Sequence, residues 1–170
     1  MSAGSALAEE CRLQLSNPEV DYGALYRGEL LSGRSGSTLP LGKRELMLIA
    51  TCNSPTPFTF RFTGEAATSK SYRFANRGEF TVRMTGATVD GQKMDLALTE
   101  GHGAPLQAPA NTKFVVPGAS VSAWGHGKPA TGRVFTAKVE IDTQIDEQMT
   151  RVRDVTLLTG HGALELHPSK

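Results

Sequence analysis

Three copies of the tripeptide Gly-His-Gly are the residues best suited to metal chemistry. They place His102, His126 and His161 along the chain, and His167 is the fourth histidine. Imidazoles of this number can bind zinc or copper. These histidines lack the short spacing of a ligand set, however, and glycines on both sides of a residue are typical of turns. We therefore expect exposed or structural histidines, with no metal site and no cofactor.

Nucleophilic catalysis has less support still. A hydrolase needs a nucleophile, a base and an orienting group, and the motif G-x-S-x-G that presents a nucleophilic serine is absent from the sequence. The glycine-rich string GRSGS at 33–37 lacks the lysine of a phosphate-binding loop. The sequence predicts a protein that is not an enzyme.

The single tryptophan is the remaining side chain with a distinctive chemistry. Trp124 stands in the string SVSAWGHGKP, two residues before His126. An indole ring can stack on a sugar, although a place in the core or at a sheet edge is the commoner role. If the protein binds a surface ligand, we expect the loops 101–112 and 124–132 to form the contact surface, with Trp124 and His126 of the second loop touching the ligand.

Cys11 and Cys52 are the only cysteines of the chain. Both stand in segments where apolar residues alternate, so both are expected on inward faces or at a sheet boundary. Adjacent strands lie ~4.8 Å apart, which brings two Cα atoms within the range of a disulfide. A disulfide is the favoured interpretation, and two buried free thiols are the alternative.

Composition places the protein in a globular class. The chain has 170 residues, 39% of them hydrophobic, and a formal net charge of +1. That size suits one domain with a core, and that charge gives no indication of nucleic-acid binding. The string SALAEE resembles the end of a secretory signal. We expect 1–10 to be a signal remnant or a flexible tail, and 11–170 to be a single domain.

The elements that position these residues are expected to be strands, because apolar residues recur at every second position. The segments with this period are 11–15, 45–52, 57–63, 71–76, 78–86, 112–118, 133–145 and 155–166. No segment has convincing helical periodicity. Many short strands separated by Gly, Pro, Ser and Asn predict an all-β sandwich or barrel.

Turn residues predict the connections between these strands. Asp90-Gly91 lies between two arms of the segment 88–100, which is a strong hairpin signal. The segments 30–42 and 101–112 are rich in Gly, Ser and Pro and are expected to be long loops. No shift of composition divides the chain into two units.

Taken in order, the motifs form a recognisable series. A first strand with Cys11 is followed by VDYG, a loop, and the strand LMLIATC that ends in Cys52. PFTFRF comes next, then the hairpin in RFANRGEFTVRMTGATVDGQKMDLAL and the terminal LLTGHGALEL. This series resembles chaperone–usher fimbrial subunits, in particular their pilin-like branch, over most of the residues 11–166.

The resemblance implies an immunoglobulin-like, pilin-type β-sandwich that lacks its last strand. An apolar groove would then border the first and the last strand of the chain. Leu13 and Leu15 would form one wall of the groove, and Leu164 and Leu166 the other. A periplasmic chaperone or a neighbouring subunit would supply the missing strand, with affinity from main-chain hydrogen bonds. The implied partners are this chaperone, an outer-membrane usher and other fimbrial subunits.

The implied function is that of a structural or tip subunit of a surface fimbria, exported to the periplasm and then to the cell surface, with an adhesin role open. Residues 1–10 do not alternate as a donor strand would, and ALELHPSK lacks the tyrosine used near the end of family members. These departures favour a subunit that receives a strand at a fibre end. The alternative is a secreted monomeric β-sandwich that binds a carbohydrate or another surface ligand.

Overall fold

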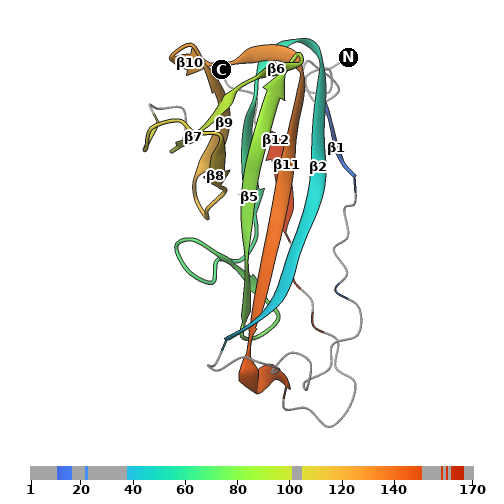
Figure 1. Ribbon diagram of the computed structural model, residues 1–170, viewed down its shortest axis with the longest axis vertical. Coiled ribbons are helices and arrows are strands. Elements are labelled where there is room, and N and C mark those ends of the chain that lie inside the picture. Colours follow the sequence, from blue (N-terminus) through green and yellow to red (C-terminus); the bar gives the residue numbers. More distant parts are fainter. Residues whose placement is uncertain are drawn as a thin grey trace, which may run out of the picture.

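The protein is an all-β sandwich, as the alternation of apolar residues predicted. The structure, a computed structural model, describes residues 11–16, 22, 38–100, 105–150, 158, 160 and 162–166. They form twelve strands and one 3-10 helix, η1 (Glu147–Thr150). The strands build two antiparallel sheets that pack against each other (Figure 1). Within these residues, no helix is long and apolar enough to cross a membrane.

The larger sheet is built around two long strands, β2 (Thr38–Pro57) and β11 (Thr131–Asp146), which pair along nearly their whole length. Its order is β1-β2-β11-β5-β4, and β6 and β8 also pair with β5. The other strands of this sheet are β1 (Cys11–Leu15), β4 (Tyr72–Phe74), β5 (Gly78–Val89), β6 (Gln92–Lys93) and β8 (Thr112–Phe114). The β2–β11 pair therefore forms the centre of this sheet.

The smaller sheet covers the inner face of the larger one. Its order is β10-β9-β3-β12, and β7 also pairs with β9. The strands are β3 (Thr59–Thr63), β7 (Asp95–Thr99), β9 (Ser120–Gly125), β10 (Lys128–Pro129) and β12 (Ala163–Leu166). Since β7 and β9 contact β5, the opposite strand β12 lies toward β2 (Figure 1).

The core lies between the two sheets and is dominated by aromatic rings. Phe58 and Phe60, at the start of the smaller sheet, pack on Phe135 of β11, with ring centroids 5.5 and 4.6 Å away. A second group joins Phe62 to Tyr72 and Phe80. The predicted inward residues of β2 and β5 are buried as well; they are Leu46, Leu48, Ala50, Cys52, Phe80, Val82 and Met84. The period of two thus identified the core face of each long strand.

One expected loop is partly wrong, because β2 begins at Thr38 inside the segment 30–42. Leu39 is 1% exposed and stands opposite Ile145, which is 2% exposed. Gly42 lies opposite Thr143 and Pro40 opposite Gln144, so Leu41 between them is an extra residue of β2 with no counterpart on β11. Gly42 has a φ of 105°, a backbone conformation that glycine adopts readily. Burial of Leu39 thus outweighs the turn signal of the neighbouring Gly and Pro residues.

Two strands of the smaller sheet were missed by the sequence analysis. β9 covers Ser120–Gly125, and β10 follows it after a turn. Only Val121 and Ala123 of β9 belong to the core, and the two serines that alternate with them, Ser120 and Ser122, are also buried. Alternation between small residues gives a weak periodic signal, which explains the omission.

The turn at Asp90-Gly91 is confirmed, but only two residues of the predicted second arm pair back onto β5. Asp90 and Gly91 have φ values of 51° and 82°, as the two central residues of a type I′ turn require. β6 then pairs with β5 for two residues. After Met94 the chain crosses to the smaller sheet, where β7 pairs with β9. The segment 88–100 therefore links the two sheets.

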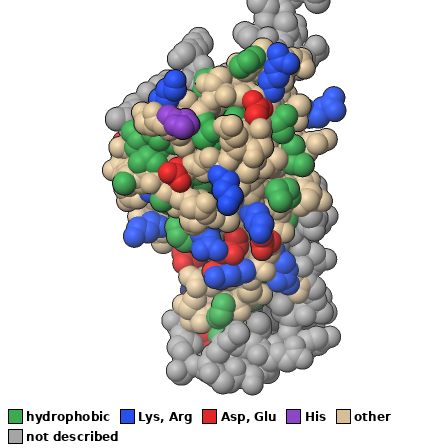
Figure 2. Space-filling view, turned by 45° about the horizontal axis from the view of Figure 1, so that its top comes forward, with side chains coloured by type: hydrophobic (Ala, Val, Ile, Leu, Met, Phe, Trp, Pro, Cys, Tyr) green, Lys and Arg blue, Asp and Glu red, His purple; other side chains and the backbone are tan. Residues whose placement is uncertain are grey.

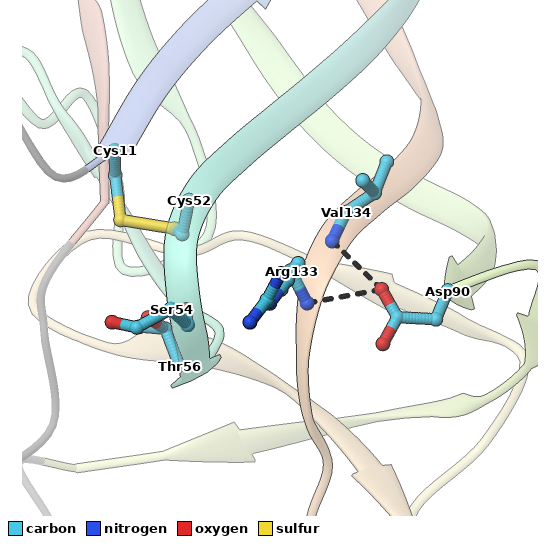
Figure 3. The surroundings of a disulfide bond; sticks show 7 residues. All are labelled: Cys11, Cys52, Ser54, Thr56, Asp90, Arg133 and Val134. Atoms are coloured by element: carbon cyan, nitrogen blue, oxygen red, sulfur yellow. Dashed lines mark hydrogen bonds between the residues drawn. A yellow bond between two sulfur atoms is a disulfide. The ribbon is translucent and has the colours of Figure 1, made fainter.

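The carboxylate of Asp90 ties this turn to β11. One oxygen, Oδ1, accepts hydrogen bonds from the backbone N–H groups of Arg133 and Val134, each at 2.9 Å (Figure 3). The pairing of β11 with β2 is irregular between Gly132 and Val134. Asp90 thus satisfies two backbone donors at the point where the ladder is interrupted.

Replacement of Asp90 is expected to destabilise the protein. Asp90→Ala loses both hydrogen bonds and puts an alanine at positive φ, so the free energy of unfolding should fall by about 2–3 kcal/mol. Asp90→Asn keeps an acceptor and tolerates this backbone conformation, so it should lose less than half as much. Urea unfolding measures both. Glu45→Ala, which removes only an ion pair between exposed side chains, is the control. Equal stability of Asp90→Ala and the control would contradict this role.

A second prediction concerns the alkaline limit of stability. Tyr72 is 1% exposed, its hydroxyl donates to the Val115 carbonyl at 2.9 Å, and burial raises its pKa from 10.0 to about 12. A raised folded-state pKa means that this contribution to stability is complete below pH 10 and is lost as the pH rises toward 12. Tyr72→Phe should therefore weaken the fall of stability between pH 10 and 12, measured by urea unfolding. The same slope in the variant and the native chain would refute the assignment.

Candidate functional site

The first strand is an edge strand with an apolar inner row. β1 pairs with β2 on one side, in a register that sets Leu13 opposite Ala50 and Leu15 opposite Leu48. Among the described strands, β1 has no partner on its other side. Leu13 and Leu15 pack on the core but are only partly buried, whereas Arg12 and Gln14 face solvent. The inner row of β1 is thus apolar and incompletely covered.

A disulfide between Cys11 and Cys52 fastens this edge strand, as the favoured interpretation of the two cysteines predicted. The two residues are directly opposite each other, with Cα atoms 4.0 Å apart (Figure 3). Cys52 is buried and Cys11 is half-buried. At the other end of β1, Ser16 exchanges hydrogen bonds of 2.9 Å with the backbone of Met47. Both ends of β1 are therefore attached to β2.

The last described strand, β12, is an edge strand of the smaller sheet. It pairs with β3, with Leu164 opposite Phe62 and Leu166 opposite Phe60. Within the described part of the chain, no strand pairs with its second edge. Leu164 and Leu166 pack on the core and are partly buried, and Ala163 and Glu165 are exposed. β12 repeats the pattern of β1.

The glycines before β12 have a packing role. A Cβ atom on Gly160 would collide with the ring of Phe74, and one on Gly162 with the ring of Phe62. Glycine lets the backbone approach these rings closely. Next to them, a hollow of about 480 Å³ is lined by Thr63, Gly64, Glu65, Arg73, Ala75, Gly160, Gly162 and Ala163. Gly160 and Gly162 thus allow close packing before the start of β12.

The two edge strands lie on the same side of the sandwich. β1 ends the larger sheet beyond β2, and β12 ends the smaller sheet on the side toward β2 (Figure 1). No backbone hydrogen bond joins the two strands among the residues that the structure describes. The four leucines expected at the groove are therefore all found on inner rows of these two edges. Pairing of a further strand with either edge is left as a prediction.

Trp124 and His126 lie together in the hairpin formed by β9 and β10. Trp124 is half-buried at the end of β9, and His126 is exposed. His126 and Gly127 have φ values of 55° and 76°, so the string Gly125-His126-Gly127 is a turn, as expected from its glycines. Trp124 is a sheet residue on the outer face, since Val121 and Ala123 of the same strand point to the core. Contact of either residue with a ligand remains a prediction.

The metal hypothesis can be compared with the structure at His126 alone. His102, His161 and His167 lie outside the described residues. Over the described ranges, no group of three or more His, Cys, Asp or Glu residues could hold a metal ion. His126 stands at an exposed turn, which fits the structural interpretation of its glycines.

The outer face of the larger sheet is charged. Arg83 and Lys43 pair with the same carboxylate, that of Glu140, at 2.9 and 3.9 Å, and Lys138 pairs with Glu45 at 3.6 Å. Figure 2 shows basic and acidic side chains intermixed across the middle of the molecule. Opposite charges on neighbouring strands support the sheet modestly and keep this face in water.

Tyr22 is an anchoring residue whose role the sequence analysis did not identify, although it belongs to the VDYG string. Its hydroxyl donates to Thr143 Oγ1 at 2.7 Å, and the Arg44 guanidinium lies 4.6 Å from its ring centroid. Burial raises the pKa of Tyr22 above its ordinary value. Tyr22 thereby contacts both β2, through Arg44, and β11, through Thr143. An aromatic residue before a loop would have been the only sequence signal.

Comparison with known proteins adds no relative: no family model, no curated protein and no solved structure matches this chain.

Proposed function

We propose that this protein is a strand-receiving subunit of a chaperone–usher surface fimbria, exported through the periplasm. Its sandwich would be immunoglobulin-like and would lack the strand that lies between β1 and β12. A neighbouring subunit would supply that strand in the fibre, and a periplasmic chaperone would supply it before assembly. An outer-membrane usher would then be the site of export.

One observation carries this proposal. The first strand and the last described strand are edges of two different sheets on the same side of the sandwich, and each has half-buried leucines on its inner row. An apolar edge with free backbone groups tends to pair with another strand. A strand inserted there could bond to β1 and β12 and cover the leucines of both.

The chemistry of the edges also specifies the strand that would fit. Inward positions next to Leu13 and Leu164 require apolar side chains, because they would face the aromatic core around Phe62. Outward positions would lie next to Arg12 and Glu165, which are exposed. The proposed donor therefore alternates apolar with polar residues, as a strand covered on one face does.

The first experiment adds a ten-residue peptide that alternates Val or Ile with Thr or Lys and follows thermal unfolding. A peptide that binds only the folded protein stabilises it by about 2.7 kcal/mol at a hundredfold excess over its Kd. For a chain of this size, the melting temperature should rise by roughly 5–10 °C. The matched control peptide carries Asp at two central apolar positions and should cause no shift.

Variants of the protein locate the binding edge. Leu164→Asn should reduce the shift produced by the peptide, because it puts an amide on the inner row of β12. Met47→Asn is the matched control, since Met47 is 39% exposed on the outer face, and it should respond as the native chain does. A native chain that melts at high temperature and ignores every peptide would overturn the proposal and favour a complete, secreted monomeric sandwich.

The disulfide gives a separate prediction about the wall formed by β1. The double variant Cys11→Ala, Cys52→Ala releases a link across 41 residues, which should lower the free energy of unfolding by ~3–4 kcal/mol. The peptide-induced shift should also become smaller, because β1 is then held less firmly. Reducing agent should destabilise the native chain and leave the double variant unchanged. A loss of less than ~1 kcal/mol would contradict the assigned role.

A further inference from the structure

Three side chains on neighbouring strands form a row on the outer face of the smaller sheet. Trp124 of β9 stands opposite Asp95 of β7 on one side and opposite Pro129 of β10 on the other. Directly opposed residues of an antiparallel ladder project from the same face. Leu96, Ala123 and Ala130, each next in sequence to a member of the row, belong to the core. The row therefore points away from the core.

The members of this row are accessible to different degrees. Asp95 and Pro129 are exposed, and Trp124 between them is half-buried. The next residues on this face are Ala97 and Ser122, which are small and buried. The Ser122 hydroxyl is 2.9 Å from the Thr59 hydroxyl, so its hydrogen-bonding needs are met within the sheet. The indole of Trp124 is thus larger than the neighbouring side chains of Ala97 and Ser122 on this face.

The backbone around the row is well defined. Trp124 is held between two strands, and the turn that follows it has His126 and Gly127 at positive φ. The Met94 side chain packs closely over Gly125, in the space that a Cβ atom would otherwise fill. His126 and Lys128 are exposed in the same hairpin. The row therefore stands on rigid elements, with two further hydrogen-bond donors near its end.

We propose that the Asp95–Trp124–Pro129 row binds a neutral pyranose sugar. An aromatic ring offers its negative face to the C–H groups of a sugar, and the proline ring extends this apolar surface. The Asp95 carboxylate accepts hydrogen bonds from sugar hydroxyls, and bonds to an ionised acceptor are the stronger kind. This inference does not depend on the proposed fibre function, because the row lies at the end of the smaller sheet opposite to β12.

Because Trp124 is the only tryptophan of the chain, its fluorescence reports directly on the row. The probes are the methyl pyranosides of glucose, galactose, mannose, fucose and N-acetylglucosamine, titrated into the full chain. We expect a saturable change of emission with at least one sugar, at millimolar concentrations because the row is shallow. No saturable change with any of the five would overturn the proposal.

Variants distinguish a binding row from a structural one. Asp95→Asn should weaken binding of the responding sugar at least about tenfold, by loss of the ionised acceptor. Glu45→Gln on the opposite sheet is the matched control and should bind as the native chain does. Trp124→Phe should retain weak binding, and Trp124→Ala should not bind. Binding to these two variants is measured by ligand-observed saturation-transfer NMR, after a thermal unfolding transition has shown that each variant is folded. Unchanged binding in Trp124→Ala would equally overturn the proposal.

Discussion

The ladder between β2 and β11 is the constraint on which the rest of the structure depends. These strands are the longest of the described chain. Their ladder runs from Thr38 opposite Asp146 to Pro57 opposite Thr131. Their inward residues meet the phenylalanines of the smaller sheet, and their outward residues bear part of the charged network. β1 can join only beside β2, and β5 only beside β11. The remaining strands of the larger sheet, β4, β6 and β8, pair with β5 and so join the central pair through it.

This arrangement explains why the beginning and the end of the described chain lie at similar edges. β1 follows β2 for five residues only, whereas β2 continues along β11. β12 joins the smaller sheet through β3 alone. Both strands must therefore keep apolar residues on an inner row that no described strand fully covers. Such edges favour pairing with another chain unless they are protected, which is why the proposed function places a partner there.

The two proposals concern opposite ends of the smaller sheet. The order β10-β9-β3-β12 puts the row of Asp95, Trp124 and Pro129 at one end and β12 at the other. A strand bound beside β12 would leave the row accessible, so assembly and ligand binding would not compete. The intervening β3 contributes the buried phenylalanines and gives both ends a rigid support.

The sequence by itself determined the local features of this protein, because apolar alternation and turn residues act over short distances. It identified the strand character, the inward faces, the Asp90-Gly91 turn and the cysteine pair. The disulfide was predictable for another reason: two cysteines allow only one pairing. Tertiary structure alone decided that the chain changes sheets after Met94, that Leu39 extends β2 and that small residues form β9. It also decided that Asp95, Trp124 and Pro129 meet, because cross-strand register depends on contacts between distant segments, which no local pattern specifies.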